Sequence, residues 1–466
     1  MEKRQTIPKG NLVQKNKNPF YTFFEYQTIY CGDKAGCLPK GIFNPLWEAI
    51  DNNVYRLKTS HKKSYDDSSE DKNIFLHGSE KQEKFIKSCN FVGVIKIKDH
   101  VLEILPKITK RNNKETTDSD IEFGRKVFLE MLKLNKELLF KDFGEVQLNT
   151  ERYPLLEVFI KMFINEVTKL SRQGLKSSYN AIEANEIFLK GKLLFSENIK
   201  KNPFRLDRFY VRYDEYNLNR PENRLIKSTL CYLMRLTSSN ANYKNINHLL
   251  SYFEQIKPST DYRSDFILCI SDRSVRHYQK VLSWCEVFLT KNSFVPAGGQ
   301  EEAFSFLFPM EEIFETYVAK KLKRLARDEY KDNQVKIQDD SSFFTKDPDG
   351  FRMRPDIVVS NKNKTVIVDT KWKVLSKYKD FRPSSEDMYQ MYAYGKKYEA
   401  QTVVLLYPEP ADLEFDKAAS SSIKTEYTVF DDIKIKTMFV SYSNEDDSID
   451  ESVNKSLRAV LDEANS

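Results

Sequence analysis

The sequence predicts a multidomain α+β protein, with a β-rich N-terminal domain, a helical middle region and a C-terminal α/β domain whose mixed sheet is flanked by helices. The chain has 466 residues, enough for about three domains of ~150 residues each. Hydrophobic residues make up 40% of it and aromatic residues 13%, which suffices for several buried cores. The spacing of apolar residues also changes twice along the chain. We therefore expect domains at residues 1–115, 121–300 and 301–445, and an acidic tail at residues 446–466.

The β-rich character of the N-terminal domain is clearest at residues 88–108, SCNFVGVIKIKDHVLEILPKI. Apolar and polar residues alternate there in two short runs, as they do in half-buried strands. The polar break at Lys98-Asp99-His100 predicts a hairpin between the two strands. The charged run at residues 110–120, KRNNKETTDSD, predicts a linker that ends the domain.

Helical periodicity dominates the middle region. In the runs LLEVFIKMFINEVTKL and RLIKSTLCYLMRL, apolar residues recur three and four positions apart, as an amphipathic helix requires. Between these runs lie EIFLKGKLLFSENIKKNPF and RFYVRYDEYNLNRPENR, which predict an extended, loop-rich crossing segment. The middle region is therefore expected to be a group of helices with one irregular excursion.

The C-terminal domain shows a regular order of elements. A helix, FPMEEIFETYVAKKLKRLARDEY, precedes a short strand at residues 335–338 and two further strands in RPDIVVSNKNKTVIVDTKWK. A helix at about residues 385–398 and the strand TVVLLY follow. This alternation predicts a small α/β domain.

Three charged side chains are placed at the ends of the two strands in RPDIVVSNKNKTVIVDTKWK. Asp356 opens the first strand, and Asp369 and Lys371 end the second. The polar residues 360–364 are typical of a turn, so a hairpin would bring the two strands side by side. Because side chains alternate along a strand, Asp369 and Lys371 point one way and Thr370 points away.

Two carboxylates that converge on one spot repel each other unless a cation lies between them. Hard oxygen ligands suit Mg²⁺, which also takes a substrate phosphate. A lysine beside the ion, here Lys371, would position the attacking water or offset charge on the phosphate. The pattern thus predicts a phosphodiester-hydrolysing site. The alternative is that these are solvated residues at strand edges.

The combination of Pro355-Asp356 with Asp369-Thr370-Lys371 resembles the PD-(D/E)xK nuclease superfamily. The resemblance implies a C-terminal nuclease domain, with Asp356, Asp369 and Thr370 assigned to the metal and Asp356, Asp369 and Lys371 to catalysis.

In that superfamily the helix before the motif often supplies another acid, and the helix after it often supplies a glutamine. Glu312 falls on the side away from the apolar stripe, whereas Glu311 and Glu315 both lie on its flank. Of these two we select Glu315. Gln390 shares a helix face with Tyr394 and is selected as the supporting glutamine. The alternatives are a solvated glutamate and a polar residue on a packing face.

A longer series of phrases resembles the McrC family, the nuclease subunits of McrBC-type modification-dependent restriction systems. FVGVIKIKDHVLEILPKI, SRQGLKSSY, FLKGKLLF, YDEYNLNRPENRLIK, FPMEEIFETYV, RPDIVV, VDTKWK and QMYAY occur in the family's order, over roughly residues 91–407. The resemblance implies a partner, an McrB-like AAA+ GTPase hexamer, whose GTP hydrolysis the N-terminal part stimulates. It also implies cleavage of double-stranded DNA in the cytoplasm of a bacterium or archaeon.

The remaining sequence features agree with that division of labour. The chain has no G-x-x-x-x-G-K-[ST] motif, so GTP is expected to bind the partner. Lys373, Lys377 and Lys379 follow the second strand and are expected to bind DNA phosphates, with a solvated basic loop as the alternative. No apolar run is long enough for a membrane span, and the first residues lack the apolar core of a secretory signal.

The sequence therefore predicts a Mg²⁺-dependent DNA endonuclease subunit of an McrBC-like restriction complex. Two alternatives remain: a mainly regulatory subunit that activates the GTPase ring, and a stand-alone structure-specific nuclease that needs no motor.

Overall fold

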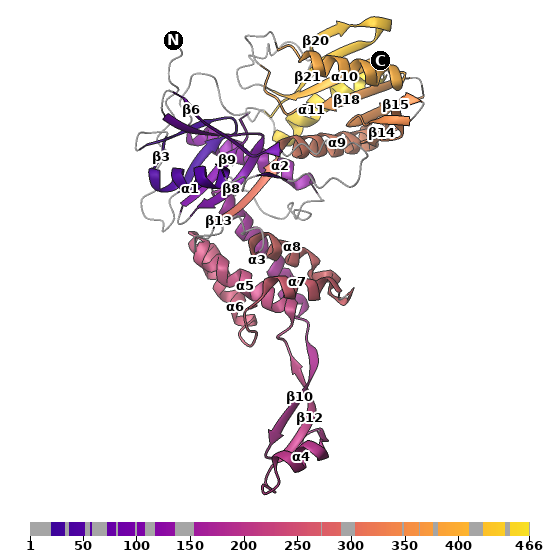
Figure 1. The fold of residues 1–466 in the computed structure, drawn as a ribbon. Helices are drawn as coiled ribbons and strands as arrows, with labels where there is room; N and C mark the ends of the chain where they lie inside the picture. Colours follow the sequence, from indigo (N-terminus) through magenta and orange to yellow (C-terminus); the bar gives the residue numbers. More distant parts are fainter. Residues whose placement is uncertain are drawn as a thin grey trace. The chain divides into compact units, whose positions relative to one another are not determined.

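The computed structural model divides into two compact units, one formed by Met1–Leu155 with Phe294–Ser466 and the other by Leu156–Ser293 (Figure 1). The structure describes residues 20–32, 37–51, 56–57, 72–80, 83–97, 100–107, 117–135, 153–271, 273–289, 303–346, 349–362, 364–375, 381–409, 423–442 and 448–465. None of the helices in these ranges is long and apolar enough to cross a membrane.

The N-terminal part of the first unit contains a four-stranded sheet in the order β1-β9-β8-β13. Its strands are β1 (Phe20–Phe24), β8 (Phe91–Ile97), β9 (His100–Leu105) and β13 (Ala303–Pro309). The predicted hairpin is confirmed, because β8 and β9 pair antiparallel up to Ile97 and His100; its turn, residues 98–99, lies outside the described residues. The sheet is completed by β13, which pairs with β8 from a distant part of the chain.

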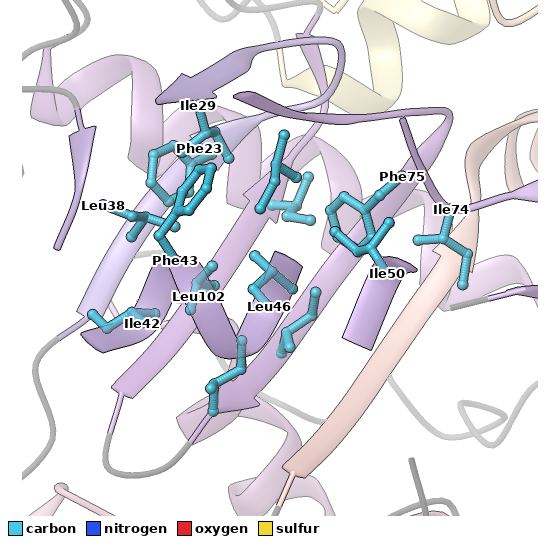
Figure 2. Packing of buried hydrophobic residues seen from close by; sticks show 14 of the residues in the cluster. Phe23, Ile29, Leu38, Ile42, Phe43, Leu46, Ile50, Ile74, Phe75 and Leu102 are labelled. Atoms are coloured by element: carbon cyan, nitrogen blue, oxygen red, sulfur yellow. The ribbon is translucent and has the colours of Figure 1, made fainter. Parts of the chain in front are cut away.

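A second sheet, in the order β3-β2-β7-β6, shares a hydrophobic core with the first sheet and with one helix. Its strands and the flanking elements are β2 (Thr28–Cys31), β3 (Cys37–Leu38), α1 (Lys40–Asp51), the β4–β5 pair (Arg56–Leu57 and Lys72–Asn73), β6 (Phe75–Glu80) and β7 (Glu83–Ser88). Figure 2 shows Phe43 and Leu46 of α1 packed among Phe23, Phe75 and Leu102, all of them buried. The N-terminal region therefore has a core of its own.

Helix α2 (Asp118–Leu134) begins inside the stretch that was expected to be a linker. Thr117 and Asp120 form a capping box, in which each side chain accepts a hydrogen bond from the other's backbone N–H. Such a box satisfies amides that would otherwise lack partners at the helix start. The expectation of a linker was therefore wrong for residues 118–120, and residues 110–116 lie outside the described residues.

The C-terminal part of the first unit is built on a six-stranded sheet in the order β14-β17-β18-β19-β21-β20 (Figure 1). Its strands are β14 (Gln334–Ile337), β17 (Ile357–Ser360), β18 (Thr365–Thr370), β19 (Thr402–Pro408), β20 (Ile423–Thr428) and β21 (Lys434–Val440). The sheet is mixed, as predicted: β18, β19 and β21 are parallel, and the other neighbours are antiparallel. A two-stranded hairpin of β15 (Ser342–Lys346) and β16 (Asp349–Met353) was not expected.

Helices cover both faces of this sheet. Helix α10 (Ser385–Lys397) packs Met391 and Tyr394 into a core that includes Ile367 of β18. Val366 and Val368 alternate with Ile367 and are fully buried, so they face the other side, where α9 (Met310–Glu329) and α11 (Ile449–Asn465) pack. Residues 446–466, expected as an acidic tail, thus include a helix that closes one face of the sheet.

The second unit is mainly helical, as predicted. Its elements are α3 (Leu155–Gln173), β10 (Ser178–Glu186), β11 (Lys192–Leu193), α4 (Phe195–Lys201), β12 (Phe209–Asn217), α5 (Pro221–Leu236), α6 (Asn240–Tyr252), α7 (Tyr262–Ser271), η4 (Arg273–Tyr278) and α8 (Gln279–Leu289). The crossing segment is extended at β12, which pairs with β10 over its whole length. Residues 187–191, 202–208 and 218–220 lie outside helices and strands, as the loop-rich prediction requires. Buried Glu157 binds α3 to the α5–α6 junction through Thr237, Ser238 and Asn242.

Candidate active site

The hairpin of β17 and β18 places the predicted acids together. Its strands pair antiparallel, with Ile357 opposite Val368 and Ser360 opposite Thr365. The turn is fixed by Asn361, whose side-chain oxygen accepts a hydrogen bond from the backbone N–H of Lys364 at 2.8 Å. Because one strand begins where the other ends, the residues just outside the paired region meet at one edge of the sheet. That edge carries Asp356, Asp369 and Lys371.

The carboxylate of Asp356 is held by Thr370. Both the backbone N–H and the hydroxyl of Thr370 donate to Oδ2 of Asp356, each at 2.7 Å. Burial raises the pKa of Asp356 and outweighs these two bonds, which lower it. Thr370 was expected to point away from the site, but its hydroxyl contacts Asp356, because Asp356 precedes the strand and reaches across to the end of β18. In this structure Thr370 orients the carboxylate of a proposed metal ligand.

Asp369 is the most deeply buried acid of the site, with 2% of its surface exposed. Its Oδ2 lies 2.7 Å from Nζ of Lys371. Burial and the charge of Asp356 raise the pKa of Asp369 to about 7, although Lys371 opposes the shift. The site therefore carries more negative charge than its single lysine balances.

Lys371 is fixed between the sheet and α10. Besides Asp369, its ammonium group contacts Oε1 of Gln390 at 3.2 Å. Burial lowers the pKa of Lys371, but the nearby carboxylates, Asp369 foremost, outweigh that effect and raise it. The side chain is thus a cation suited to offset charge on a phosphate, and not a base.

Glu315 approaches the same edge from α9. Its Oε1 accepts a hydrogen bond from Nε2 of Gln338 at 2.6 Å. Burial, followed by the charge of Asp356, raises the pKa of Glu315 to about 7. Glu311 and Glu312 are exposed, whereas Glu315 is close enough to Asp356 for that charge to raise its pKa.

Helix α10 supports the site with a chain of hydrogen bonds. Nε2 of Gln390 donates to the hydroxyl of Tyr394 at 3.1 Å, and that hydroxyl donates to the backbone oxygen of Arg354 at 3.3 Å. The predicted common face of Gln390 and Tyr394 is confirmed. These hydrogen bonds connect α10 to the backbone just before Pro355-Asp356.

Sequence reasoning missed Gln338 and Arg354. Arg354 donates to Oε1 of Gln338, and the backbone N–H of Gln338 donates to the backbone oxygen of Asp356 at 2.7 Å. Gln338 has a left-handed backbone conformation, with φ at +51°, which residues other than glycine rarely adopt. The sequence placed Gln338 inside a short strand at residues 335–338, whereas it directly follows β14, which ends at Ile337. Nothing local in the sequence indicated its partners.

The predicted DNA-binding lysines are only partly described. Nζ of Lys373 lies 3.4 Å from Oδ1 of Asp387, and 52% of the Lys373 side chain is exposed. Asp387 is buried on α10 and forms an ion pair with Lys373. Lys377 and Lys379 lie outside the described residues. Their assignment to DNA stays a prediction.

The donor set suits a hard divalent cation. Among the described residues there is no group of three or more His, Cys, Asp or Glu side chains that could hold a metal ion. Asp356 and Asp369 nevertheless raise the negative charge at one buried point, which a cation would relieve. Mg²⁺ is commonly held by one or two carboxylates and completes its shell with water and substrate phosphate. Two aspartates therefore fit such an ion.

Comparisons with known proteins gave two solved structures and one family. A chain of the Thermococcus gammatolerans assembly of McrB AAA+ hexamers with bound McrC has a similar fold, with a TM-score of 0.68 and 21% identity over 95% of this chain and 100% of that one. A chain of the McrBC complex from the same organism gives a TM-score of 0.48 and 23% identity over 66% and 87%. No curated protein sequence matches the chain. The profile of the McrBC 5-methylcytosine restriction system component matches residues 86–408, more than half of the sequence, and the chain belongs to that family.

Proposed function

We propose that this chain is the Mg²⁺-dependent DNA endonuclease subunit of an McrBC-type restriction complex, with a C-terminal nuclease of the PD-(D/E)xK type. One observation carries the proposal: Asp356, Asp369 and Lys371 converge at one edge of a mixed sheet. Glu315 and Gln390 reach that edge from the helices on either side of the motif. Such a set of oxygen donors with one fixed cation suits phosphodiester hydrolysis.

Each side chain has a role in this proposal. Asp356 and Asp369 would hold the ion, which would supply polarisation of the phosphate and easier deprotonation of water. Lys371 offsets the charge that develops on the phosphate, and Gln390 keeps Lys371 in place. Glu315 completes the acidic edge from α9, held by Gln338.

The partner is proposed to be an McrB-like AAA+ GTPase hexamer. The family membership and the likeness to a chain of an McrB–McrC assembly support this partner. The chain itself contains no Walker-type phosphate loop, so GTP would bind the partner. The N-terminal region is proposed to engage the ring, and modified double-stranded DNA in the cytoplasm of a bacterium or archaeon is the proposed substrate.

The test compares DNA cleavage with GTPase stimulation. In the Asp369→Ala variant we expect cleavage to fall at least ~100-fold, because the ion loses a carboxylate, while stimulation of the partner's GTPase is kept. Asp328→Asn, an exposed acid at the far end of α9, is the matched control and should cleave normally. Loss of both activities in Asp369→Ala would contradict the separation of roles.

Two results would favour the other candidate functions. Efficient cleavage by the chain with Mg²⁺ alone, without partner or GTP, would indicate a stand-alone nuclease. GTPase stimulation by the unaltered chain without any cleavage of modified DNA would indicate a regulatory subunit.

A further inference from the structure

A buried contact joins the N-terminal region to the proposed active site. Trp372 directly follows Lys371, and its indole Nε1–H donates to Oε1 of Glu25 at 2.8 Å and to Oε2 at 3.1 Å. Glu25 lies just after β1 and has 1% of its surface exposed, and Trp372 has 3%. Both residues belong to the first unit. The contact is therefore dry and connects two parts of the chain that are remote in sequence.

Glu25 is firmly anchored to the N-terminal sheet. Its backbone N–H donates to the oxygen of Leu105, at the end of β9, at 2.9 Å. Its Oε1 also accepts the backbone N–H of Lys107 at 3.0 Å. A buried carboxylate is costly unless hydrogen bonds satisfy it, and here the bonds come from both sides of the contact. Glu25 thus presents a fixed acceptor to the indole.

Trp372 in turn is linked to both elements that carry site residues, the end of β18 and the start of α9. Through the backbone it follows Lys371, whose N–H donates to Leu406 of β19 at 2.9 Å. Its ring packs against Phe314, with centroids 5.2 Å apart, and Phe314 precedes Glu315 on α9. A displacement of the indole would therefore move both the end of β18 and the first turns of α9.

We propose that Glu25 and Trp372 are positioning residues of the nuclease site, which hold Lys371 and Glu315 at their places by fixing the end of β18 and the start of α9 to the N-terminal sheet. The inference rests on the proposed nuclease function. Neither residue touches the reacting atoms. Their effect comes through alignment, and misplacement of a catalytic group by ~1 Å can cost about 100-fold in rate.

The test uses the full chain with its GTPase partner, GTP, Mg²⁺ and modified DNA. Trp372→Phe keeps a ring against Phe314 but removes the N–H donor, and Glu25→Leu removes the acceptor. We expect each to lower kcat about 10-fold or more with KM changed less than about twofold, since alignment and not substrate binding is lost. Glu25→Gln keeps an acceptor oxygen and should retain kcat within about threefold. The double variant Glu25→Leu/Trp372→Phe should be no slower than either single variant, because both remove one contact.

A matched control separates positioning from lost stability. Tyr330→Phe removes one hydrogen bond from the far end of α9, the 2.8 Å bond from its hydroxyl to Asp462 of α11, and should leave kcat unchanged. Thermal unfolding shows whether each variant is folded. The chain has 3 Trp, so the indole N–H signal of Trp372 can be assigned by NMR from its loss in Trp372→Phe. That signal should shift in Glu25→Gln and stay in place in Tyr330→Phe.

The outcomes distinguish this inference from the function on which it rests. If the unaltered chain cleaves DNA and folded Trp372→Phe and Glu25→Leu keep its kcat, the positioning role is wrong and the nuclease proposal stands. If these variants raise KM alone, the contact serves DNA binding and the positioning role is again wrong. If the unaltered chain with partner, GTP and Mg²⁺ does not cleave modified DNA, the proposed function fails and this inference fails with it.

Discussion

At the scale of single residues, the site contains more carboxylates than its neighbouring cationic side chains balance. Asp369 and Glu315 both have pKa values raised to about 7 by burial and by Asp356. Near neutral pH a fraction of each therefore carries a proton while no cation is bound. A divalent ion needs the charged form of its ligand Asp369, and its charge also favours the charged form of nearby Glu315, so its binding displaces protons from both.

Divalent-ion affinity should accordingly depend on pH. We expect the affinity of the full chain for Mg²⁺ or Mn²⁺ to rise as pH increases from about 6 to 8 and to level off above, since the raised pKa values of Asp369 and Glu315 lie near 7. Calorimetry in buffers of different ionisation enthalpy measures the protons released. Asp369→Asn should weaken binding and reduce the release, and an affinity that is constant across this range would contradict the prediction.

Glu25 predicts a pH effect on stability. Burial raises its pKa from 4.5 to about 7 in the folded chain, although the Lys107 and Trp372 hydrogen bonds lower it. Between these pH values the folded state binds the extra proton, so this group's contribution to stability is full below about pH 4.5 and is lost as pH rises to about 7. At ~1.4 kcal/mol per unit, the loss is up to about 3 kcal/mol.

Replacing Glu25 by Gln should remove that pH dependence. The difference in Tm, variant minus unaltered chain, is expected to be more positive at pH 8 than at pH 5, because only the unaltered chain ionises a buried group. Glu426→Gln, an acid on the exposed side of β20 whose pKa is lowered by Lys434, is the control and should show no such rise toward pH 8.

At the scale of elements, α11 is a structural part of the C-terminal sheet. Val453, Leu457 and Leu461 are fully buried, and the helix is tied to α9 by hydrogen bonds from Lys321 to Asp450 and from Arg458 to Glu329. A helix that buries a whole apolar face contributes to the core on which the strand ends of the site depend.

Truncating one core residue of α11 should test this role. We expect Leu457→Ala to lower the free energy of unfolding by about 2–5 kcal/mol, through lost burial and the cavity left behind. Lys455→Ala, an exposed position on the same helix, should change it by less than about 0.5 kcal/mol. Denaturant unfolding followed by tryptophan fluorescence measures both, and equal stabilities would contradict the packed role of α11.

The elements that the sequence predicted are those with local signals. The β17–β18 hairpin was predicted because two apolar runs flank a polar turn, and α9 and α10 because their apolar residues follow the helical period. The convergence of Asp356 with Asp369 followed from that hairpin alone. Gln338 and Glu25 were missed because their partners, Glu315 and Trp372, lie far away in the chain, and no periodicity encodes such a pairing.

At the scale of the whole molecule, closure of the first unit depends on a close approach between β8 and β13. Gly93 of β8 has φ at +145°, and a Cβ added there would meet the backbone oxygen of Phe306 at 2.0 Å. Only glycine lets the two backbones come so near without strain. A glycine at position 93 is therefore needed for β13 to pair with β8.

Gly93→Ala should destabilise the first unit. We expect a loss on the order of 2–4 kcal/mol, because the new methyl group forces β13 away from β8. In Gly41→Ala, on α1, the added Cβ would meet nothing within 4 Å, so this control should lose no stability. Thermal unfolding of both variants decides, and an unchanged Gly93→Ala would contradict the close approach.

The pairing of β8 with β13 also has a consequence for synthesis on the ribosome. Strand β8 ends at Ile97 and its partner β13 begins at Ala303, so one edge of β8 stays without β13 while the intervening residues are synthesised. At about 5–20 residues per second this lasts roughly 10 to 40 seconds. An unpaired strand edge is a site of aggregation. The inserted unit, Leu156–Ser293, is synthesised before β13, so its helices can fold before the first sheet is finished.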